Sequence, residues 1–385
     1  MERKLRMGMI GGGRDAFIGA VHRIAANLDG GIQLVCGAFS SNPEKSKLSG
    51  ADLYLPSARC YGTYEEMIKA EAALEQGERM DFVSIVTPNH VHFKPAKMAM
   101  EYGFDVVIDK PISFSLEEAR MLQKVSMETG RLLVLTHTYT GYPMVKQAKE
   151  MIASGALGII RKVYVEYLQG WLYQKLEDSD QKQASWRTDP QKSGIAGCMG
   201  DIGTHAFNLA EYVTGLQVTE MCAELNTVVN GRQLDDDGMV LLRFGNGATG
   251  TLLATQVATG EENNIRIKVF GDKGGLEWQQ EDCNSLLVKW PEAPRQIFRT
   301  GTGYAGALAA YNSRTPAGHP EGYLEAFANI YRNAATCIAD RIAGKASDSH
   351  VLDFPGLEDG IRGMAFIEQV VKHSKSDKKW NDFIV

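Results

Sequence analysis

The sequence predicts an α/β protein of two domains, in which a doubly wound parallel sheet is followed by an α/β domain with a large, mainly antiparallel, open sheet. The length of 385 residues exceeds what one ordinary hydrophobic core encloses, which favours two domains. Short apolar segments alternate with helical segments as far as residue 136, the pattern of a parallel sheet covered by helices. Beyond it, β-rich segments joined by hairpin turns predominate. We therefore expect a first domain over 1–136 and a second over 137–385.

The composition is typical of a soluble globular protein, with 44% of the residues hydrophobic and 23% charged. A formal net charge of −6 argues against nucleic acid or an anionic membrane as the main partner. The six cysteines are scattered without a CxxC pair, which favours reduced thiols over a disulfide framework or a zinc site. There is no apolar signal-peptide region at the N-terminus and no stretch resembling a membrane span, so we expect a cytoplasmic protein.

A glycine turn stands near the start of the first domain. A short apolar strand runs into the glycine triplet at 11–13, and a helical segment follows. Glycines at such a turn let backbone N–H groups approach a pyrophosphate at the N-terminus of the helix. Gly11 and Gly13 match the first two glycines of the GxGxxG pattern. Ala16 stands at the third position in its alanine form, and Gly19 falls three positions outside the pattern.

The second strand, Ile32–Phe39, bears on the choice of cofactor. A carboxylate at the end of this strand usually holds the adenosine ribose of NAD. Here the strand runs into Ser40 and Ser41, and Lys45 and Lys47 lie behind them. Hydroxyls and lysines tolerate a 2′-phosphate, so NAD and NADP are both open.

Three further parallel strands are expected, over Asp81–Val86, Asp105–Ile108 and Leu132–Thr136. In an open parallel sheet, ligands bind beyond the C-terminal ends of the strands. The glycine turn, Pro88–His92 and Lys110 all lie at such ends. Their convergence is a stronger indication of a nucleotide site than any one of these motifs.

The second domain is expected to begin with a helix over Tyr142–Ser154. Residues 174–192 are polar and irregular, which indicates a loop near the site or a solvated excursion. Hairpin signals such as Gly245-Asn246-Gly247 indicate an antiparallel sheet. One broad face of this sheet needs cover, so a subunit interface is expected. The expected strands are Ile159–Leu168, Val218–Val229, Gly238–Phe244, Ala248–Ala258, Ile265–Phe270, Gly275–Gln279 and Ser285–Trp290, and the late helices are Gly322–Gly344 and Pro355–His373.

Asp201 and His205 lie in a predicted helix over Met199–Thr214. Four positions apart, the carboxylate and the imidazole share one face of a helix. A carboxylate that orients a histidine is one way to hold a general acid/base, and a structural helix with an incidental contact is the alternative. A metal site would need a third ligand and an open position, which nothing nearby supplies, so no metal is expected.

Four stretches carry a resemblance to a known family. They read GMIGGGRDAFIGAVHR (Gly8–Arg23), TPNHVHFKPAKMAM (Thr87–Met100), VVIDKPIS (Val106–Ser113) and GDIGTHAFNLAEYVTG (Gly200–Gly215). In their order and spacing, and over nearly the whole chain, they resemble the Gfo/Idh/MocA family of NAD(P)-dependent oxidoreductases. The chain departs from the family in having Asp109 where Glu-Lys-Pro is usual, and in lacking the acidic residue after the second strand.

The resemblance implies a Rossmann domain followed by an α/β domain with an open sheet, commonly assembled into homodimers or homotetramers. It also implies hydride exchange between NAD or NADP and a carbon-bound hydroxyl, most often of a sugar, cyclitol or glycoside. By the same resemblance, Lys110 would lie beside the substrate hydroxyl and the nicotinamide ribose, with Asp201 and His205 facing it from the second domain.

The chemistry of these side chains suits alcohol oxidation. A neutral His205 can take the hydroxyl proton near neutral pH. Lys110 supplies positive charge where an alkoxide develops, and Asp201 can orient His205 or bind a neighbouring hydroxyl. The expected catalytic residues are Lys110, Asp201 and His205; the expected cofactor-binding residues are Gly11, Gly13, Phe17, Ile18, Ser40, Ser41, Lys45, Thr87, Pro88, Asn89, His92, Asp109 and Lys110; the expected substrate-binding residues are Lys110, Tyr139, Trp186, Arg187, Asp201 and His205.

A dehydrogenase of sugars, cyclitols or glycosides is the leading hypothesis. A second is an NAD-dependent glycoside-processing enzyme, which hydrolyses or eliminates through a transient oxidation and regenerates its cofactor in each turnover. A third is a non-catalytic sensor of dinucleotide or sugar on the same scaffold. Such sensors tend to lose the lysine and the histidine, and this chain keeps both.

Overall fold

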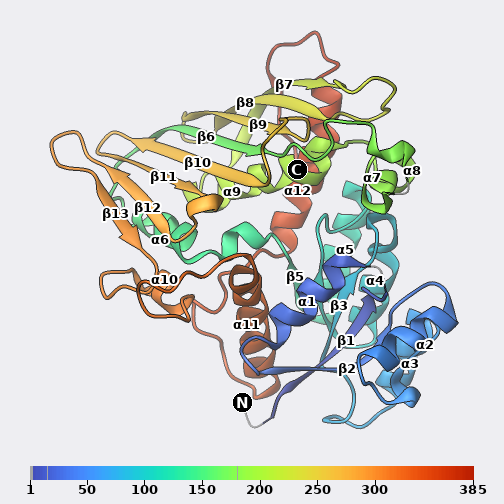
Figure 1. Ribbon diagram of the computed structural model, residues 1–385. Helices are drawn as coiled ribbons and strands as arrows, with labels where there is room; N and C mark the ends of the chain where they lie inside the picture. Colours follow the sequence, from blue (N-terminus) through green and yellow to red (C-terminus); the bar gives the residue numbers. More distant parts are fainter. Residues whose placement is uncertain (1–2, 15, 180) are drawn as a thin grey trace. The chain divides into compact units, whose positions relative to one another are not determined.

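The computed structural model describes residues 3–14, 16–179 and 181–385 (Figure 1). The chain forms two compact units, the first of Met1–Thr138 with Tyr323–Ile361 and the second of Tyr139–Gly322 with Arg362–Val385. The expected division after residue 136 differs from these units in two places: His137 and Thr138 belong to the first unit, and the chain returns to that unit over Tyr323–Ile361.

The first unit contains a five-stranded sheet in the order β2-β1-β3-β4-β5. All of its strand pairs are parallel, so the doubly wound parallel sheet predicted from the alternation of strands and helices is confirmed. The strands are β1 (Leu5–Gly11), β2 (Ile32–Ala38), β3 (Phe82–Val86), β4 (Asp105–Ile108) and β5 (Leu133–Leu135).

The helices of the first unit begin and end where local chemistry directs. Thr63 and Glu66 form a capping box at the start of the helix over Tyr64–Ala72. The side chain of Ser115 accepts a hydrogen bond from the Glu118 N–H, and Gly130 ends the same helix in the left-handed region at φ 64°. The α-helices are α1 (Phe17–Asn27), α2 (Pro43–Asp52), α3 (Tyr64–Ala72), α4 (Phe93–Glu101), α5 (Leu116–Thr129) and α11 (Tyr323–Ile342), with 3₁₀ turns at Ser57–Arg59 and Asn89–Val91. A further 3₁₀ turn, Thr138–Gly141, spans the boundary between the units.

The helix α11 belongs to the core of the first unit, although it follows the second unit in sequence. It lies beside α1 (Figure 1). Its buried side chains Phe327, Tyr331 and Ile338 join one apolar cluster with Val21 of α1 and Phe82 of β3. The sequence assigned this helix to the second domain because chain order was the only guide, whereas the burial of its apolar face decides its place.

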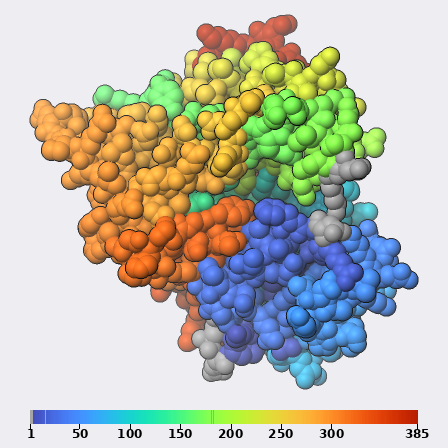
Figure 2. Space-filling model, viewed as in Figure 1, coloured from blue at the N-terminus to red at the C-terminus, as the bar shows by residue number. Residues whose placement is uncertain are grey.

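The second unit contains a nine-stranded sheet in the order β13-β12-β11-β10-β6-β9-β8-β7-β14. Its neighbours pair antiparallel except β6 with β9, so the large, mainly antiparallel sheet is confirmed. Figure 2 shows strands β10 to β13 (orange) at the surface of this unit. The strands are β6 (Ile160–Leu168), β7 (Val218–Asn226), β8 (Asp237–Phe244), β9 (Thr249–Thr255), β10 (Asn264–Gly271), β11 (Gly275–Gln279), β12 (Ser285–Lys289), β13 (Gln296–Arg299) and β14 (Asn381–Asp382).

The helices of the second unit correct two expectations. The polar stretch 174–192 is not irregular throughout, because it contains α7 and α8. The helix expected over 199–214 is α-helical only from Thr204, since Met199–Gly203 forms a π-helical turn. The elements are α6 (Pro143–Ala153), α7 (Lys182–Arg187), α8 (Pro190–Ser193), α9 (Thr204–Thr214) and α10 (Ala307–Tyr311), with 3₁₀ turns at Leu176–Asp178 and Gln280–Asp282. The helix α12 (Leu357–His373) begins in the first unit and enters the second at Arg362.

No helix in the described part of the chain is long and apolar enough to cross a membrane.

Candidate active site

The glycine turn after β1 brings bare backbone to the C-terminal edge of the parallel sheet. Gly11 and Gly12 have φ of 81° and 70°, in the left-handed region that favours glycine. A Cβ added to Gly13 would lie 2.7 Å from the carbonyl oxygen of Phe39 and 2.7 Å from Oγ of Ser49. A side chain at this position would therefore collide with the neighbouring strand end and with α2.

The close approach of helix to turn is made by Gly19, which corrects the expected motif. A Cβ on Gly19 would lie 2.3 Å from Cα and 2.5 Å from O of Gly12, so only glycine fits. Ala16, expected at this third position, is instead the N-cap residue of α1. The turn is three residues longer than GxGxxG, and the fixed spacing of that pattern therefore missed the residue that performs the packing.

The first turn of α1 suits an anionic ligand. Its N-cap, Ala16, makes no side-chain hydrogen bond to the helix, and the first turn holds no acidic residue. A helix N-terminus carries backbone N–H groups without intrahelical partners and a partial positive charge. The N–H groups of Phe17 and Ile18, together with the glycine cradle, fit the pyrophosphate of a dinucleotide.

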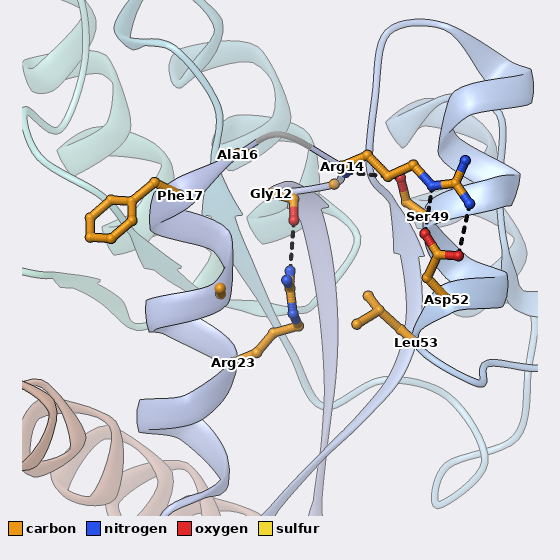
Figure 3. A pocket seen from close by; sticks show the side chains of 10 residues that line it. Gly12, Arg14, Ala16, Phe17, Arg23, Ser49, Asp52 and Leu53 are labelled. Atoms are coloured by element: carbon orange, nitrogen blue, oxygen red, sulfur yellow. Dashed lines mark hydrogen bonds and ion pairs between the residues drawn. The ribbon is translucent and has the colours of Figure 1, made fainter.

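A cavity of about 360 Å³ lies beside the turn, between α1 and α2 (Figure 3). Arg23 donates from Nη1 to the carbonyl oxygen of Gly12 at 2.6 Å, which holds the turn from below. Arg14 pairs through Nη2 with Oδ1 of Asp52 at 2.8 Å, and its N–H donates to Ser49 Oγ at 3.1 Å. The Arg14 guanidinium lowers the pKa of Asp52, with burial opposing it weakly.

The end of β2 carries no carboxylate. The N–H of Asn42 donates to Oγ of Ser40 at 3.2 Å, and Oδ1 of Asn42 accepts from the N–H of Lys45 at 2.9 Å, which caps α2. Ser40 is half-buried and Ser41 is exposed. The hydroxyl groups expected to meet the adenosine ribose thus lie beside the capped helix.

His92 joins the loops that follow β3 and β4. Its Nδ1 lies 2.7 Å from the carbonyl oxygen of Pro111, and its Nε2 lies 2.8 Å from that of Thr87. The ring is wholly buried, and burial lowers its pKa. Both ring nitrogens face carbonyl oxygens inside the protein, so the ring links the two loops, and its contact with a cofactor stays a prediction.

Asp109 is an ionised carboxylate at the end of β4. Its Oδ1 accepts from the backbone N–H of Lys110 at 3.0 Å and from the hydroxyl of Thr136 at 3.1 Å. Burial alone would raise its pKa, but the neighbouring His22, Lys110 and His92 outweigh burial and bring the pKa to about 2. The charge of Asp109 therefore persists beside the half-buried Lys110, whose peptide bond to Pro111 is cis.

In the second unit, Asp201 is the acceptor of a polar cluster. Its Oδ2 accepts from Nε2 of Gln256 at 2.9 Å and from Nε of Arg187 at 3.1 Å. Asp235 fixes the preceding loop, since its carboxylate accepts from the N–H groups of Gly197 and Met199 at 2.7 and 2.8 Å. Asp201 thus stands in a π-helical turn whose start is anchored from a distant loop.

The His205 ring is packed against tyrosines. It is 8% exposed, and it meets Tyr139 edge to face with ring centres 5.0 Å apart and planes at 85°. The Tyr139 hydroxyl bonds to the hydroxyl of Tyr167, which donates to Asn263 Oδ1 at 2.8 Å. Tyr139, expected to bind substrate, is buried, and its hydroxyl belongs to this network. Its ring packs against the imidazole of His205.

Trp186 and Arg187, also expected to bind substrate, lie on α7. The Arg187 guanidinium is 4.3 Å from the Trp186 ring centre and 6.0 Å from that of Trp171, and it also bonds to Gln183. The Arg187 side chain therefore interacts with Asp201 and with the two indole rings. Trp186 is half-buried. The sequence did not indicate Gln256, because a single amide just after a strand carries no periodic or motif signal.

The remaining expected cofactor residues, Thr87, Pro88 and Asn89, occupy the loop between β3 and α4, at the same sheet edge as the glycine turn. Among residues 3–14, 16–179 and 181–385, no group of three or more His, Cys, Asp or Glu side chains is arranged to hold a metal ion.

Replacing His137 by Gln should make the protein less sensitive to acid. Burial, reinforced by the charge of Lys110 and opposed by Asp109, lowers the pKa of His137 to about 3. The unfolded chain binds this proton near pH 6.5 and the folded chain does not, so wild-type stability falls as the pH drops below 6.5. Between pH 7.5 and pH 5, His137 accounts for a loss of about 2 kcal/mol.

Urea unfolding of wild type and His137→Gln at both pH values measures this difference, with exposed His319→Gln as the matched control. An equal loss of unfolding free energy in wild type and His137→Gln would contradict a buried neutral imidazole.

Two family models match the chain. One, described as the oxidoreductase family with an NAD-binding Rossmann fold, matches residues 5–150. The other, described as the GFO/IDH/MocA C-terminal domain, matches residues 145–277.

Three relatives illustrate the similarity. The chain is 31% identical over 389 residues to the uncharacterized oxidoreductase YfiI of Bacillus subtilis, covering 100% of this chain and 98% of the relative. An inositol dehydrogenase homolog from Azotobacter vinelandii, crystallised with NADH and myo-inositol, is 31% identical with a TM-score of 0.90, over 99% of this chain and 98% of that one. The levoglucosan dehydrogenase of Pseudarthrobacter phenanthrenivorans is 27% identical over 325 residues, covering 77% of this chain and 80% of the relative.

The glycine cradle with its open helix N-terminus agrees with a match to an NAD-binding family, and both domains of the chain match in the expected order. As the resemblance of its four motifs indicated, the chain belongs to the Gfo/Idh/MocA family of NAD-binding oxidoreductases.

Proposed function

We propose that this enzyme oxidises a secondary hydroxyl of a sugar, cyclitol or glycoside, with His205 as the general acid/base. The observation that carries the proposal is the fixed carboxylate of Asp201, held by Arg187 and Gln256 four residues before the packed imidazole of His205. The names of two relatives, which act on levoglucosan or were crystallised with myo-inositol, support a polyhydroxylated substrate.

In the proposed reaction, His205 takes the proton of the substrate hydroxyl while hydride leaves the same carbon. Lys110 offers positive charge to the oxygen as an alkoxide develops. Asp201 accepts a hydrogen bond from a neighbouring hydroxyl or from the imidazole. The nicotinamide, when bound, accepts the hydride.

We propose that the pyrophosphate of the cofactor is held by the backbone at Gly11, Gly13, Phe17 and Ile18. The support is the uncapped first turn of α1 and the left-handed backbone of Gly11 and Gly12 in the turn before it. In the same proposal the ribose and adenine meet Ser40, Ser41 and Lys45, and the nicotinamide half passes Thr87, Pro88, Asn89, Asp109 and Lys110.

The second sheet offers a face for self-association, and we propose a homodimer or homotetramer built on it. Tyr164, Thr251 and Leu241 lie side by side on β6, β9 and β8, which puts them on one face. Leu241 is 37% exposed, Tyr164 43% and the nearby Met239 49%. Apolar side chains gathered in this way on an open sheet are typical of a subunit interface.

We also propose a cytoplasmic location. Cys36, Cys60 and Cys198 are buried thiols, which agrees with a reducing compartment.

The catalytic assignment is tested by mixing the protein with NAD or NADP and a panel of inositols, sugars and glycosides, and following reduced nicotinamide by absorbance. His205→Asn should lower kcat/KM by about 10²- to 10⁴-fold, because a general base is lost. Lys110→Met should lower it by about 10²- to 10³-fold, because the developing charge is no longer stabilised.

Exposed Lys94→Met is the matched control and should leave turnover unchanged. Full activity of His205→Asn would contradict the assignment of the base. Silence across the panel, with NADH shown to bind, would contradict a net dehydrogenase; product formed without NADH would identify an enzyme that regenerates its cofactor.

The cofactor preference is tested with Ser41→Asp. Because no carboxylate stands at the end of β2, wild type should bind NADH and NADPH with dissociation constants within about tenfold of each other. A new carboxylate there repels the 2′-phosphate and should weaken NADPH binding by about tenfold more than NADH binding.

Fluorescence titration of both cofactors measures these constants, with exposed Ser57→Asp as the control. A wild-type protein that already rejects NADPH by more than about a hundredfold would contradict the reasoning, since another group would then decide the preference.

The interface is tested with Leu241→Asp, which puts a charge in the middle of the apolar face. Light scattering after size-exclusion chromatography should give a dimer or tetramer for wild type and a smaller species for Leu241→Asp. Met127→Asp, which changes a side chain 79% exposed on α5, should leave the mass unchanged. A monomeric wild type would refute the proposed assembly.

A further inference from the structure

Three buried polar side chains form a connected chain in the first unit, near the loop after β4 that carries Asp109 and Lys110. The hydroxyl of Ser84 on β3 lies 2.7 Å from the hydroxyl of Tyr331 on α11, and that hydroxyl lies 2.7 Å from Nδ1 of His22 on α1. All three side chains are buried, with Ser84 and His22 at 0% exposure. Phe327 packs edge to face on the His22 ring with centres 4.7 Å apart, so the imidazole cannot turn freely.

The other ring nitrogen of His22 faces Asp109. In the described part of the chain, Nε2 of His22 is buried and makes no hydrogen bond. It lies 3.9 Å from Oδ1 of Asp109, longer than a hydrogen bond but close enough for a strong electrostatic contact. Asp109 is therefore the charged group that this buried ring nitrogen faces.

The two neutral forms of the ring differ in what they present to the carboxylate. If Nδ1 carried the proton, it would donate to Tyr331, and the lone pair of Nε2 would face the anionic Asp109. If Nε2 carries the proton, the Ser84 hydroxyl donates to Tyr331, Tyr331 donates to Nδ1, and the Nε2–H points its positive end at Asp109. Of the two neutral forms, only the second makes every contact favourable.

We propose that His22 is a positioning residue for Lys110. In this proposal the Nε2–H of His22, oriented by the chain from Ser84 through Tyr331, steadies the Asp109 carboxylate, which in turn accepts the backbone N–H of Lys110. The importance of Lys110 itself rests on the proposed function above.

The other groups near Asp109 do not make the contact that we propose for His22. Thr136 donates its hydroxyl to the same oxygen that accepts the Lys110 N–H. The two ring nitrogens of His92 face the carbonyl oxygens of Thr87 and Pro111 instead of Asp109. His22 thus connects the Asp109 carboxylate to α1, on which it lies, and to Tyr331 of α11.

The first test reads the proton directly and needs no substrate. Nitrogen-15 NMR of the full-length protein should show one histidine, identified by its loss in His22→Gln, with the proton on Nε2 and none on Nδ1. Asp109→Asn should shift the Nε2 resonance of this ring, and Tyr331→Phe should let the proton populate Nδ1. A wild-type ring protonated at Nδ1, alone or together with Nε2, would overturn the proposal.

The second test separates positioning from simple packing by comparing three substitutions. His22→Gln keeps an N–H near the place of Nε2, His22→Asn keeps a polar group only near the place of Nδ1, and His22→Leu keeps neither. We expect kcat to fall about tenfold in His22→Asn and His22→Leu and less than threefold in His22→Gln, with the dissociation constant of NADH unchanged in all three.

A double-substitution cycle then asks whether His22 acts through Asp109. In an Asp109→Ala background, His22→Leu should have no further effect on kcat. Multiplying effects, or a loss of NADH affinity that parallels the loss of kcat, would show a merely structural role and overturn the proposal. An inactive wild type would count against the proposed function alone, because the NMR result stands independently of turnover.

Discussion

The contact between the backbones of Gly12 and Gly19 is the constraint on which the first unit depends. Because neither residue has a Cβ, α1 can begin directly against the turn that ends β1. The helix N-terminus then stands at the C-terminal edge of the parallel sheet, where its N–H groups can serve a ligand. The same placement fixes which face of α1 is buried further along the helix. Val21 therefore packs in the core, and His22 lies against Tyr331.

Two carboxylates, one in each unit, are held by hydrogen bonds in the same way. Asp109 and Asp201 are both acceptors for donors that come from distant parts of the chain: Thr136 for the first, Arg187 and Gln256 for the second. A partly buried anion costs free energy unless such donors satisfy it, and once satisfied it is held rigidly. The fold thereby fixes the orientation of acidic groups that in solution would rotate freely.

Local chemistry made several features of the sequence readable. The capping box at Thr63 and Glu66 and the glycine that ends α5 follow from hydrogen bonds within one helix turn. The predictions from sequence were wrong where they assumed a fixed spacing between residues. Ala16 was expected at the position that Gly19 fills, and the π-helical turn before His205 was expected to be α-helical. Both irregular stretches are too short to show a period of their own in the sequence.

The sequence by itself determined the two kinds of sheet, the strand–glycine–helix unit and the family, since periodicity, turn residues and ordered motifs are local signals. Only the tertiary structure decided that α11 belongs to the core beneath α1, that Arg187 is committed to Asp201, and that His22 faces Asp109. These contacts join residues far apart in the chain through single polar atoms or through one apolar face. They depend on packing and on the need of each buried charge for a donor, neither of which leaves a periodic mark in the sequence.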